Sequence, residues 1–474
     1  KKVGEFVKME SWMSHRIRLR DSESILIDKG RAKNMFWVEL LIVLVVIFIG
    51  VRVGGTFMAM AGGVGMLILT FVFHVPASDP PITVILIMLA VICAASTMQA
   101  CGGLDYMVKI AEKILKKNPR MITILAPVVT YLFTFMCGTG HIVYSLLPVI
   151  NEIAIENGVR PERPISASVV SSQQAITACP ISAATVSVLA FMAESAKYSH
   201  VTIFKLLLVC IPATLIGTVV AAISVLKKGK ELAEDPEFQA RVAEGKVQDF
   251  TKLVKEEKPT TKEAKISVAI FMVAMVGIVV MGAFQTLLPT FPDGSKLPLV
   301  TVIQIFMLVA AAVMVILTKT DSDKILDQPV FRSGSFAVLL AFGLVWMVNT
   351  FINDQYSFIT DNMSVLTNQY PWIFIVAIFL VGAITTSQSS TTMIMVPIGI
   401  ALGLPANIIV AGWLACSSNY FIPCASQCVA AIGFDSAGTT KIGKFILNHS
   451  YMIPGLVCTI VSVVSALVLG AVIL

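Results

Sequence analysis

Long apolar runs separated by short polar stretches occupy most of this chain. A helix that crosses a bilayer needs ~20 mostly apolar residues. Uninterrupted apolar spans lie near residues 36–50, 54–73, 82–100, 203–226, 266–289, 298–318, 333–350 and 445–474. The pattern predicts an all-α polytopic membrane protein. In residues 104–120, by contrast, apolar residues recur at helical spacing and basic residues lie between them. This pattern predicts an amphipathic helix on the membrane surface.

One apolar segment, MCGTGHIVYSLLP at 136–148, is interrupted at mid-length by a glycine pair around a threonine. Such a pair breaks a helix. At membrane depth, hydrocarbon cannot satisfy the exposed backbone groups, so the break is tolerated only where it lines a polar cavity. A helix that starts there directs free N–H groups and its positive dipole end at the cavity. The segment is therefore suited to hold an anion.

Three further apolar segments are interrupted in a similar way. Residues 121–155, which contain the interruption described above, and residues 372–402 each read as an apolar arm, a polar tip and a returning arm. The arms are too short to cross a membrane comfortably. We therefore predict two re-entrant hairpins. Residues 165–192 contain SSQQ followed by CP. Residues 406–434 contain SSN followed by PCASQ. Proline and mid-span polar groups predict two discontinuous transmembrane helices.

The two halves of the chain correspond. GTGHIVYSLLPV aligns with SQSSTTMIMVPI, and SSQQAITACPIS aligns with SSNYFIPCASQ. The matched prolines, Pro148 with Pro397 and Pro180 with Pro423, are 249 and 243 positions apart. We predict repeat halves at 35–226 and 266–474, joined by a polar linker at 227–265 that we expect to be a solvated connector. Residues 1–34 are a polar leader that we exclude from the fold.

Charge then predicts the orientation. The basic or long loops surround Arg52 and residues 109–120, 156–164, 227–265, 319–332 and 435–444, whereas loops 74–81, 290–297 and 351–370 are poor in cations. The positive-inside rule places the basic set in the cytoplasm. Threading the spans then puts the Met35 end and the carboxyl terminus in the periplasm. The repeats are therefore inverted, as in secondary transporters with a midplane site.

Composition narrows the partners. The chain is 56% hydrophobic and 14% charged, against about a quarter charged in soluble domains, and its net charge of +6 lies in loops. The lipid bilayer is therefore expected as its surroundings, and nucleic acid is not expected as a partner. The nine cysteines lie mostly in apolar runs and read as packing residues. No histidine or cysteine set has the spacing of metal ligands, so we expect no metal or cofactor.

The two tips and the two broken spans supply neutral donors and acceptors that suit a small substrate with a carboxylate at each end. The candidate substrate-binding residues are Gly138, Thr139, Gly140, His141, Ser171, Ser172, Gln173, Pro180, Ser182, Ser389, Ser390, Thr391, Thr392, Ser417, Ser418, Asn419, Pro423 and Ser426. No intramembrane Asp or Glu offers an obvious proton relay. His141 is either a packed core residue or a substrate or proton ligand. The serines of any one tip could instead pack helices.

These motifs resemble a known family. GGLDYMVKIAEKILKKNP, CGTGHIVYSLLP, RPERPISASVVSSQQAITACPIS and SQSSTTMIMVP look like the Dcu-type anaerobic C4-dicarboxylate transporters of Gram-negative bacteria, A/B branch, from about Met35 to the end. The resemblance implies exchange of fumarate, malate or aspartate for succinate across the inner membrane in fumarate respiration. It also implies a homodimer with an elevator-like transport domain. More distantly, the tips are similar to the Ser-Asn-Thr tips of divalent-anion/sodium symporters, but here they read Gly-Thr-Gly and Ser-Ser-Thr.

Other functions stay open at this point. A sodium- or proton-coupled symporter of citrate, gluconate or lactate would have the same kind of site. An intramembrane serine hydrolase using His141 would need a GxSxG elbow and an acid to orient the histidine, and the sequence offers neither. Some members of the resembled family also act as partners of a sensor kinase. The preferred dicarboxylate and the coupling ion are not encoded in a readable motif.

Overall fold

The computed structural model describes residues 35–50, 52–53, 56–244, 260–358, 369–423, 425–443 and 448–474, and the predicted leader at 1–34 lies outside them. Strand pairing within these ranges is limited to two isolated bridges, Thr290 with Lys296 and Ile442 with His449. Seven of the described helices are long and apolar enough to cross a membrane: Ile82–Ala100, Pro119–Cys137, Ile203–Ser224, Lys262–Ala283, Leu299–Thr318, Pro329–Asp354 and Met452–Ile473. The prediction of an all-α polytopic membrane protein is confirmed.

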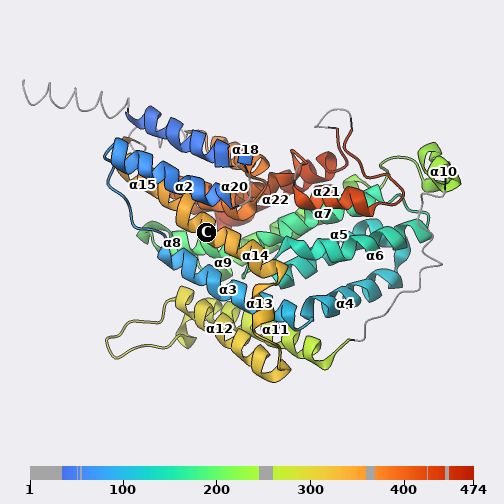
Figure 1. The fold of residues 1–474 in the computed structure, drawn as a ribbon, viewed down its shortest axis with the longest axis horizontal. Helices are drawn as coiled ribbons and strands as arrows, with labels where there is room; N and C mark the ends of the chain where they lie inside the picture. The colour runs from blue at the N-terminus through green and yellow to red at the C-terminus, as the bar shows by residue number, and fades with distance from the viewer. Residues whose placement is uncertain are drawn as a thin grey trace, which may run out of the picture.

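One group of helices, which we call the body, carries all four polar interruptions (Figure 1). From the first half it contains α5 (Ile122–Cys137), α6 (Val143–Glu156), α7 (Glu162–Ile176), α8 (Ala183–Ala193) and α9 (Ile203–Ser224). From the second half it contains α18 (Trp372–Thr385), α19 (Gln388–Ala401), α20 (Ala406–Trp413), the 3-10 helix η10 (Leu414–Tyr420), α21 (Ser426–Phe434) and α22 (Met452–Ile473). The two halves meet most extensively where α9 packs on α22.

Small residues allow that close packing. A Cβ on Gly217 of α9 would overlap the hydroxyl of Ser462 on α22 and lie 2.7 Å from the carbonyl oxygen of Cys458. Helices in membranes commonly associate through small residues in this way, because lipid provides little hydrophobic drive for one helix to bury against another. Inside the first half, Tyr131 of α5 and Thr214 of α9 share a buried hydrogen bond of 2.8 Å. The body is therefore held together by both tight backbone approach and buried polar contacts.

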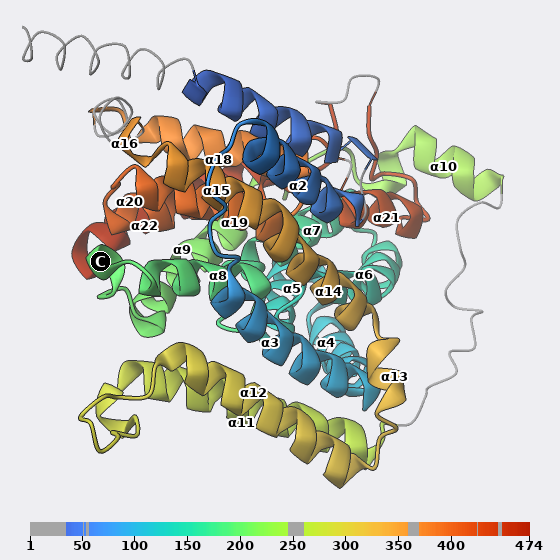
Figure 2. The same ribbon diagram turned by 60° about the vertical axis from the view of Figure 1, so that its left-hand side comes forward.

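The remaining long helices form a second group, which we call the scaffold (Figure 2). It consists of the helix at Met35–Gly50, α2 (Phe57–Leu67) with the π-helical turn Ile68–Val72, α3 (Ile82–Ala100), α4 (Gly103–Lys117), α11 (Lys262–Ala283), α12 (Leu299–Thr318), the short α13 (Asp323–Leu326), α14 (Pro329–Leu340) with the π-helical turn η8 (Ala341–Val345), and α15 (Trp346–Asp354). Within it, α3 packs on α12 and α14, and α11 packs on α12. The scaffold meets the body chiefly where α3 contacts α8 and α4 contacts α5 and α6.

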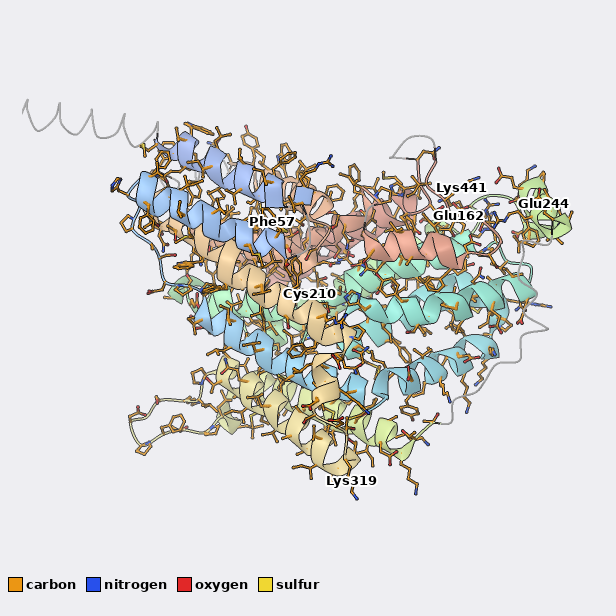
Figure 3. All side chains as sticks on the ribbon, viewed as in Figure 1. Phe57, Glu162, Cys210, Glu244, Lys319 and Lys441 are labelled. Carbon is orange, nitrogen blue, oxygen red and sulfur yellow. The ribbon has the colours of Figure 1, made fainter. Side chains whose placement is uncertain are left out.

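The predicted amphipathic helix is α4, and its place at the membrane surface stays a prediction. Its buried residues, Gly103, Met107, Ala111 and Leu115, recur every four positions and so form one stripe along the helix. Its last turn carries Lys116 and Lys117, which complements the negative end of the helix dipole. Figure 3 shows the side chains of this helix and of the neighbouring elements on the ribbon.

The first part of the linker is mostly exposed, but ion pairs attach it to the body. Arg160, whose side chain is 9% exposed, pairs with Glu162 at 2.8 Å and with Asp235 of the linker. Lys228 of the linker pairs with the other oxygen of Glu162 at 3.0 Å. We call Arg160, Glu162, Lys228 and Asp235 the charge cluster. The sequence did not predict this attachment, because a charge-rich composition does not show which charges find partners; residues 245–259 lie outside the described ranges.

The charge cluster also joins the linker to the loop before α22. Ser450 donates a hydrogen bond of 2.8 Å to Glu162 Oε1, and Lys228 donates one of 2.9 Å to the carbonyl of Ser450. Burial opposes ionisation of Glu162, but Lys228 and Arg160 outweigh it and hold the pKa of this carboxyl below its usual range. The linker after α9 therefore folds onto the body at its charged end, where η5 (Leu232–Glu234) and α10 (Pro236–Ala243) lie.

Candidate functional site

The first tip is a tight turn between α5 and α6 in which successive residues take different backbone conformations. Helix α5 ends at Cys137, Gly138 adopts the left-handed conformation with φ +71°, and Thr139 is extended at φ −142° and ψ 137°. A 3-10 turn, Gly140–Ile142, then leads directly into α6. The Thr139 hydroxyl accepts a hydrogen bond from the His141 amide at 3.3 Å, which caps the new helix. The glycine is needed because its φ is one that side chains rarely adopt.

The second tip repeats that order of conformations. Helix α18 ends at Thr385, Thr386 is left-handed with φ 52°, and Ser387 is extended at φ −143° and ψ 119° before α19 begins. The Ser387 hydroxyl accepts from the Ser390 amide at 3.2 Å, so it caps α19 as Thr139 caps the other tip. Gly138 and Thr386 are 248 positions apart in the chain. This is one fewer than the 249 positions between the aligned prolines, Pro148 and Pro397. The difference is taken up by the tight 3-10 turn in the first tip.

The two broken spans are also interrupted where the sequence indicated. The chain between Ile176, the end of α7, and Ser182 is non-helical, and Ser182 caps α8 by accepting from the Thr185 amide at 3.2 Å. In the other span, α20 passes into the 3-10 helix η10, and α21 starts afresh at Ser426. One expectation about the hairpins is corrected. With its preceding turn, the first arm runs from Pro119 to Cys137, and these 19 residues are long enough to cross a membrane.

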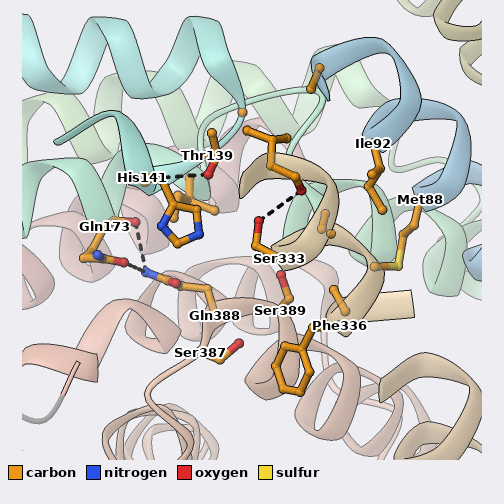
Figure 4. Close-up of a pocket in the computed structure, with 18 of the residues that line it drawn as sticks. Met88, Ile92, Thr139, His141, Gln173, Ser333, Phe336, Ser387, Gln388 and Ser389 are labelled. Atoms are coloured by element: carbon orange, nitrogen blue, oxygen red, sulfur yellow. Dashed lines mark hydrogen bonds between the residues drawn. The ribbon is translucent and has the colours of Figure 1, made fainter. Parts of the chain in front are cut away.

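A cavity of about 450 Å³ lies between these breaks and the scaffold (Figure 4). Its volume is typical of small-molecule sites. The body contributes Cys137, Gly138, Thr139, Gly140, His141, Gln173, Ile176, Ile181, Ala183, Val186, Thr385, Thr386, Ser387, Gln388, Ser389, Asn419, Ser426 and Gln427. The scaffold contributes Met58 from α2, Met88, Val91, Ile92 and Ala95 from α3, and Val330, Ser333, Gly334, Phe336 and Ala337 from α14.

Four helices begin at this cavity. Its lining includes the first residues of the helical segment at Gly140, of α19 at Gln388 and Ser389, of α21 at Ser426 and Gln427, and of α8 at Ala183. The first N–H groups of a helix lack intrahelical acceptors, and the helix dipole places partial positive charge there. None of the described lining residues is Lys, Arg, Asp or Glu. The cavity is thus favourable to anions without containing a fixed charge.

Buried amides connect the second tip to both broken spans. Gln388 Nε2 of α19 donates to Gln173 Oε1 of α7 at 2.6 Å, and Asn419 Nδ2 of η10 donates to the same oxygen at 2.9 Å. The ring of His141 stacks on Tyr144 with centroids 5.8 Å apart, and Tyr144 donates to the Ser426 hydroxyl at 2.7 Å. Each half of the chain therefore supplies groups that orient the other half's lining residues.

Eight of the residues selected from the sequence line this cavity: Gly138, Thr139, Gly140, His141, Gln173, Ser389, Asn419 and Ser426. The other ten lie outside its lining. Two of them hydrogen-bond to lining residues. Ser172 donates to the Gly140 carbonyl at 3.2 Å, and Thr392 donates to the Gln388 carbonyl at 2.7 Å. The remaining eight are Ser171, Pro180, Ser182, Ser390, Thr391, Ser417, Ser418 and Pro423.

The sequence argument missed two kinds of lining residue. Thr385, Thr386, Ser387 and Gln388 belong to the polar run of the second tip, but the selection began at Ser389. The alignment of Ser387 with Gly138 was the signal that could have included them. The scaffold residues carried no such signal, because Met58, Met88 and Phe336 read as ordinary membrane-span residues. Apolar residues of this kind are indistinguishable in sequence from lipid-facing or packed ones.

The fold and the site define a membrane transporter: helical spans enclose an uncharged cavity lined by helix breaks on one side and by an apolar wall on the other. The chain belongs to the family described as anaerobic C4-dicarboxylate membrane transporters, whose model matches residues 35–474. The resemblance predicted from the motifs is therefore confirmed. Because the family and its curated relatives are membrane transporters, the hydrolase alternative is excluded.

Named relatives cover nearly the whole chain. The anaerobic C4-dicarboxylate transporter DcuB of Escherichia coli O6:H1 is 38% identical over 441 residues, 92% of this chain and 99% of the relative. The C4-dicarboxylate transporter DcuA of Wolinella succinogenes is 36% identical over 439 residues, with the same coverage. Among solved structures, the YdaH transporter of Alcanivorax borkumensis matches with a TM-score of 0.55 at 13% identity, covering 92% of this chain and 97% of that one. That likeness concerns the fold alone.

Proposed function

We propose that this protein exchanges C4-dicarboxylates across the bacterial inner membrane, taking in fumarate, malate or aspartate and releasing succinate. The observation that carries the proposal is the convergence of four helix N-termini on one cavity that has no charged lining residue among those described. A dianion of four carbons has two carboxylates to place, and helix N-termini bind such groups through their free N–H donors. Family membership and the names of the relatives support the same substrate class.

The division of the cavity wall supports an elevator-like movement of the body past the scaffold. The tips, the broken spans and every amide in the lining belong to the body, whereas the scaffold wall is apolar apart from the Ser333 hydroxyl and backbone. Ser333 itself donates to the Val330 carbonyl at 3.1 Å. A substrate bound mainly by the body can travel with it, since few hydrogen bonds to the scaffold must break. The same reasoning makes the broken spans part of the moving unit.

Several finer assignments belong to this proposal. The substrate would bind in the cavity lined by the eight residues selected from the sequence and by the second tip from Thr385 to Gln388. The repeats would be inverted, the two hairpins re-entrant, and both the Met35 end and the carboxyl terminus periplasmic. Basic loops, among them the segment of the charge cluster, would face the cytoplasm. Action as a homodimer in anaerobic respiration, and contact with a sensor kinase, follow only from the resemblance.

The direct test is transport in proteoliposomes containing the purified full chain. Labelled succinate should enter rapidly when the vesicles hold unlabelled fumarate, malate or aspartate, and slowly when they hold buffer alone. The alternative, a sodium- or proton-coupled symporter of another small organic anion, requires uptake into buffer-filled vesicles on imposing an ion gradient. Uptake that needs such a gradient and ignores internal dicarboxylate would contradict exchange. Labelled citrate or lactate outcompeting succinate would contradict the substrate class.

A further inference from the structure

Gln173 carries a hydrogen-bond donor that the structure leaves without an acceptor. The residue lies within α7, three positions before its end, and it lines the cavity although it is only 1% exposed. Its Nε2 atom has no hydrogen-bond partner in the part of the chain that the structure describes. Buried amide donors are nearly always satisfied in folded proteins, because leaving one unpaired is unfavourable. A ligand or a water molecule in the cavity can supply the missing acceptor.

Two neighbours, Gln388 and Asn419, fix which end of this carboxamide is free, and Figure 4 shows the bonds from Gln388. Gln388 Nε2 donates to Gln173 Oε1 at 2.6 Å and to the Gln173 carbonyl at 3.3 Å, and Asn419 Nδ2 donates to Oε1 at 2.9 Å. Two donors directed at one atom identify it as the oxygen, so the nitrogen is the end of the carboxamide without a partner. Gln388 directs its nitrogen at Gln173 in both bonds. The role of Gln388 Nε2 is therefore to orient Gln173, because both of its hydrogen bonds go to that residue and leave it no donor for a ligand.

The free nitrogen faces the first tip. A Cβ built on Gly140 would stand 3.6 Å from Gln173 Nε2, and both residues line the cavity. The donor is thus beside the start of the helical segment that leads into α6, where a carboxylate would already be favoured by the helix end. A side-chain donor and a helix N-terminus converge on the same point from different elements of the first half. A carboxylate oxygen, which only accepts hydrogen bonds, fits both.

We propose that Gln173 binds one carboxylate of the substrate through Nε2, and that this contact makes the site prefer a carboxylate over an uncharged carboxamide at that end. Gln388 and Asn419 are positioning residues that hold the carboxamide by Oε1 and so leave Nε2 as its unpaired end. The inference rests on the proposed dicarboxylate function and goes further by naming the group that distinguishes a diacid from its half-amide. Gln173→Glu tests it, because Glu keeps Oε1 for both neighbours and replaces the donor by a negatively charged acceptor.

The experiment compares succinate with succinamate, its half-amide, as competitors of labelled succinate counterflow in proteoliposomes. Wild type should favour succinate. Gln173→Glu should weaken succinate at least tenfold and reverse the preference, because the amide NH₂ can donate to the new carboxylate. Gln388→Met adds no charge but frees the Gln173 carboxamide to rotate, and should lower the succinate preference several-fold. The matched control is Gln174→Glu: Gln174 is buried, donates to the Leu414 carbonyl at 3.3 Å and does not line the cavity.

The outcomes separate this inference from the function on which it rests. If Gln173→Glu and Gln388→Met prefer succinate over succinamate as strongly as wild type does, the role of Gln173 is overturned. Dicarboxylate exchange itself is unaffected by that result. An equal reversal in Gln174→Glu also overturns it, since a buried charge in α7 would then suffice. If Gln173→Glu cannot be reconstituted, the ratio in Gln388→Met decides alone. A wild type that shows no counterflow with any C4-dicarboxylate contradicts the proposed function itself.

Discussion

Gly138 and Thr386 occupy the same place in the two tips: each ends its helix in the left-handed conformation and is followed by an extended residue that caps the next helix. Their φ angles are +71° and 52°. A β-branched residue rarely adopts this conformation, so Thr386 is held there by its surroundings. Two unrelated residue types thus make one turn, which supports the correspondence between the halves beyond the aligned letters.

The first prediction concerns Gly138. Gly138→Ala should lower stability by more than the ~1–2 kcal/mol of placing a side chain in the left-handed region. The added Cβ would also lie 3.2 Å from the Ile181 side chain and 3.4 Å from its carbonyl oxygen. Gly158→Ala is the matched control, since Gly158 has the same φ of +71° with nothing within 4 Å of the added carbon. Thermal unfolding in detergent and succinate uptake are measured on both.

Gly158→Ala should lose some stability and keep its uptake, whereas Gly138→Ala should lose both. Equal losses in the two variants would mean that only the backbone angle matters and that the contact with Ile181 does not position the tip.

The second prediction uses charge at the start of α19. Ser389 lines the cavity in the first turn of that helix. Ser389→Asp should stabilise the helix slightly, by ~0.3–1 kcal/mol, because a carboxylate there complements the dipole. The same carboxylate should abolish succinate uptake, since it competes with the substrate for the helix end. Ser389→Asn is the neutral control of similar size and should retain measurable uptake. Full uptake by the Asp variant would show that the α19 end does not bind an anion.

The third prediction tests the scaffold. A Cβ on Gly62 of α2 would overlap the backbone of Gly343 in η8, and backbone cannot move aside as a side-chain tip can. Gly62→Ala should therefore destabilise the protein by ~1–3 kcal/mol, the usual range for overpacking. Gly63→Ala has nothing within 4 Å of the added carbon and should be neutral or slightly stabilising. Thermal unfolding of the two variants measures the difference, and identical melting temperatures would refute the close crossing of α2 with η8.

The fourth prediction concerns the charge cluster. Removing one partner of a buried ion pair commonly costs ~3–5 kcal/mol, so Arg160→Gln should be strongly destabilising. Lys441→Met is the control: Lys441 pairs with Glu237 at 3.0 Å, but its side chain is 53% exposed, and such pairs contribute only ~0–1 kcal/mol. Unfolding of both variants at neutral pH gives the comparison. Similar small losses would mean that the linker is not anchored through Arg160.

The same cluster predicts a pH dependence. Although burial raises it, the pKa of Asp235 is held below its ordinary 3.8 by a backbone N–H and by Arg160, and the pKa of Glu162 lies below its ordinary 4.5. A carboxyl with a lowered pKa in the folded state stabilises that state fully above its unfolded pKa, and this stabilisation disappears as the pH falls through the folded value. Stability should therefore fall below about pH 4.5, and less steeply in Arg160→Gln. Melting temperatures measured from pH 7 downward give both slopes; equal slopes would contradict this.

The sequence predicted the helix breaks well because breaking a helix requires particular residues. The break at Gly138 was readable from glycine conformational freedom and from the need to satisfy backbone groups in lipid. The polar run of the second tip predicted a helix break, but it did not show which of its side chains point into the cavity. Successive residues of α19 point about 100° apart, so Ser389 lines the cavity while Thr391 turns back to bond the Ser387 carbonyl at 2.8 Å.

Two features were beyond the sequence. The apolar wall formed by residues such as Met88 and Phe336 depends on which span the body meets, and hydropathy carries no such information. The pairing of Arg160 with Asp235 joins residues 75 positions apart, and composition alone described the second of these as part of a solvated linker. In both cases the missing information is tertiary.

The central claim is that one cavity between the two tips receives a dicarboxylate at converging helix N-termini. The most direct measurement is an experimental structure of the full chain determined with succinate. We predict succinate between Gly140 and Ser389, with one carboxylate at the start of each helix and its apolar middle against Phe336. Succinate bound elsewhere, or tips too far apart for one four-carbon molecule to reach both, would contradict the account.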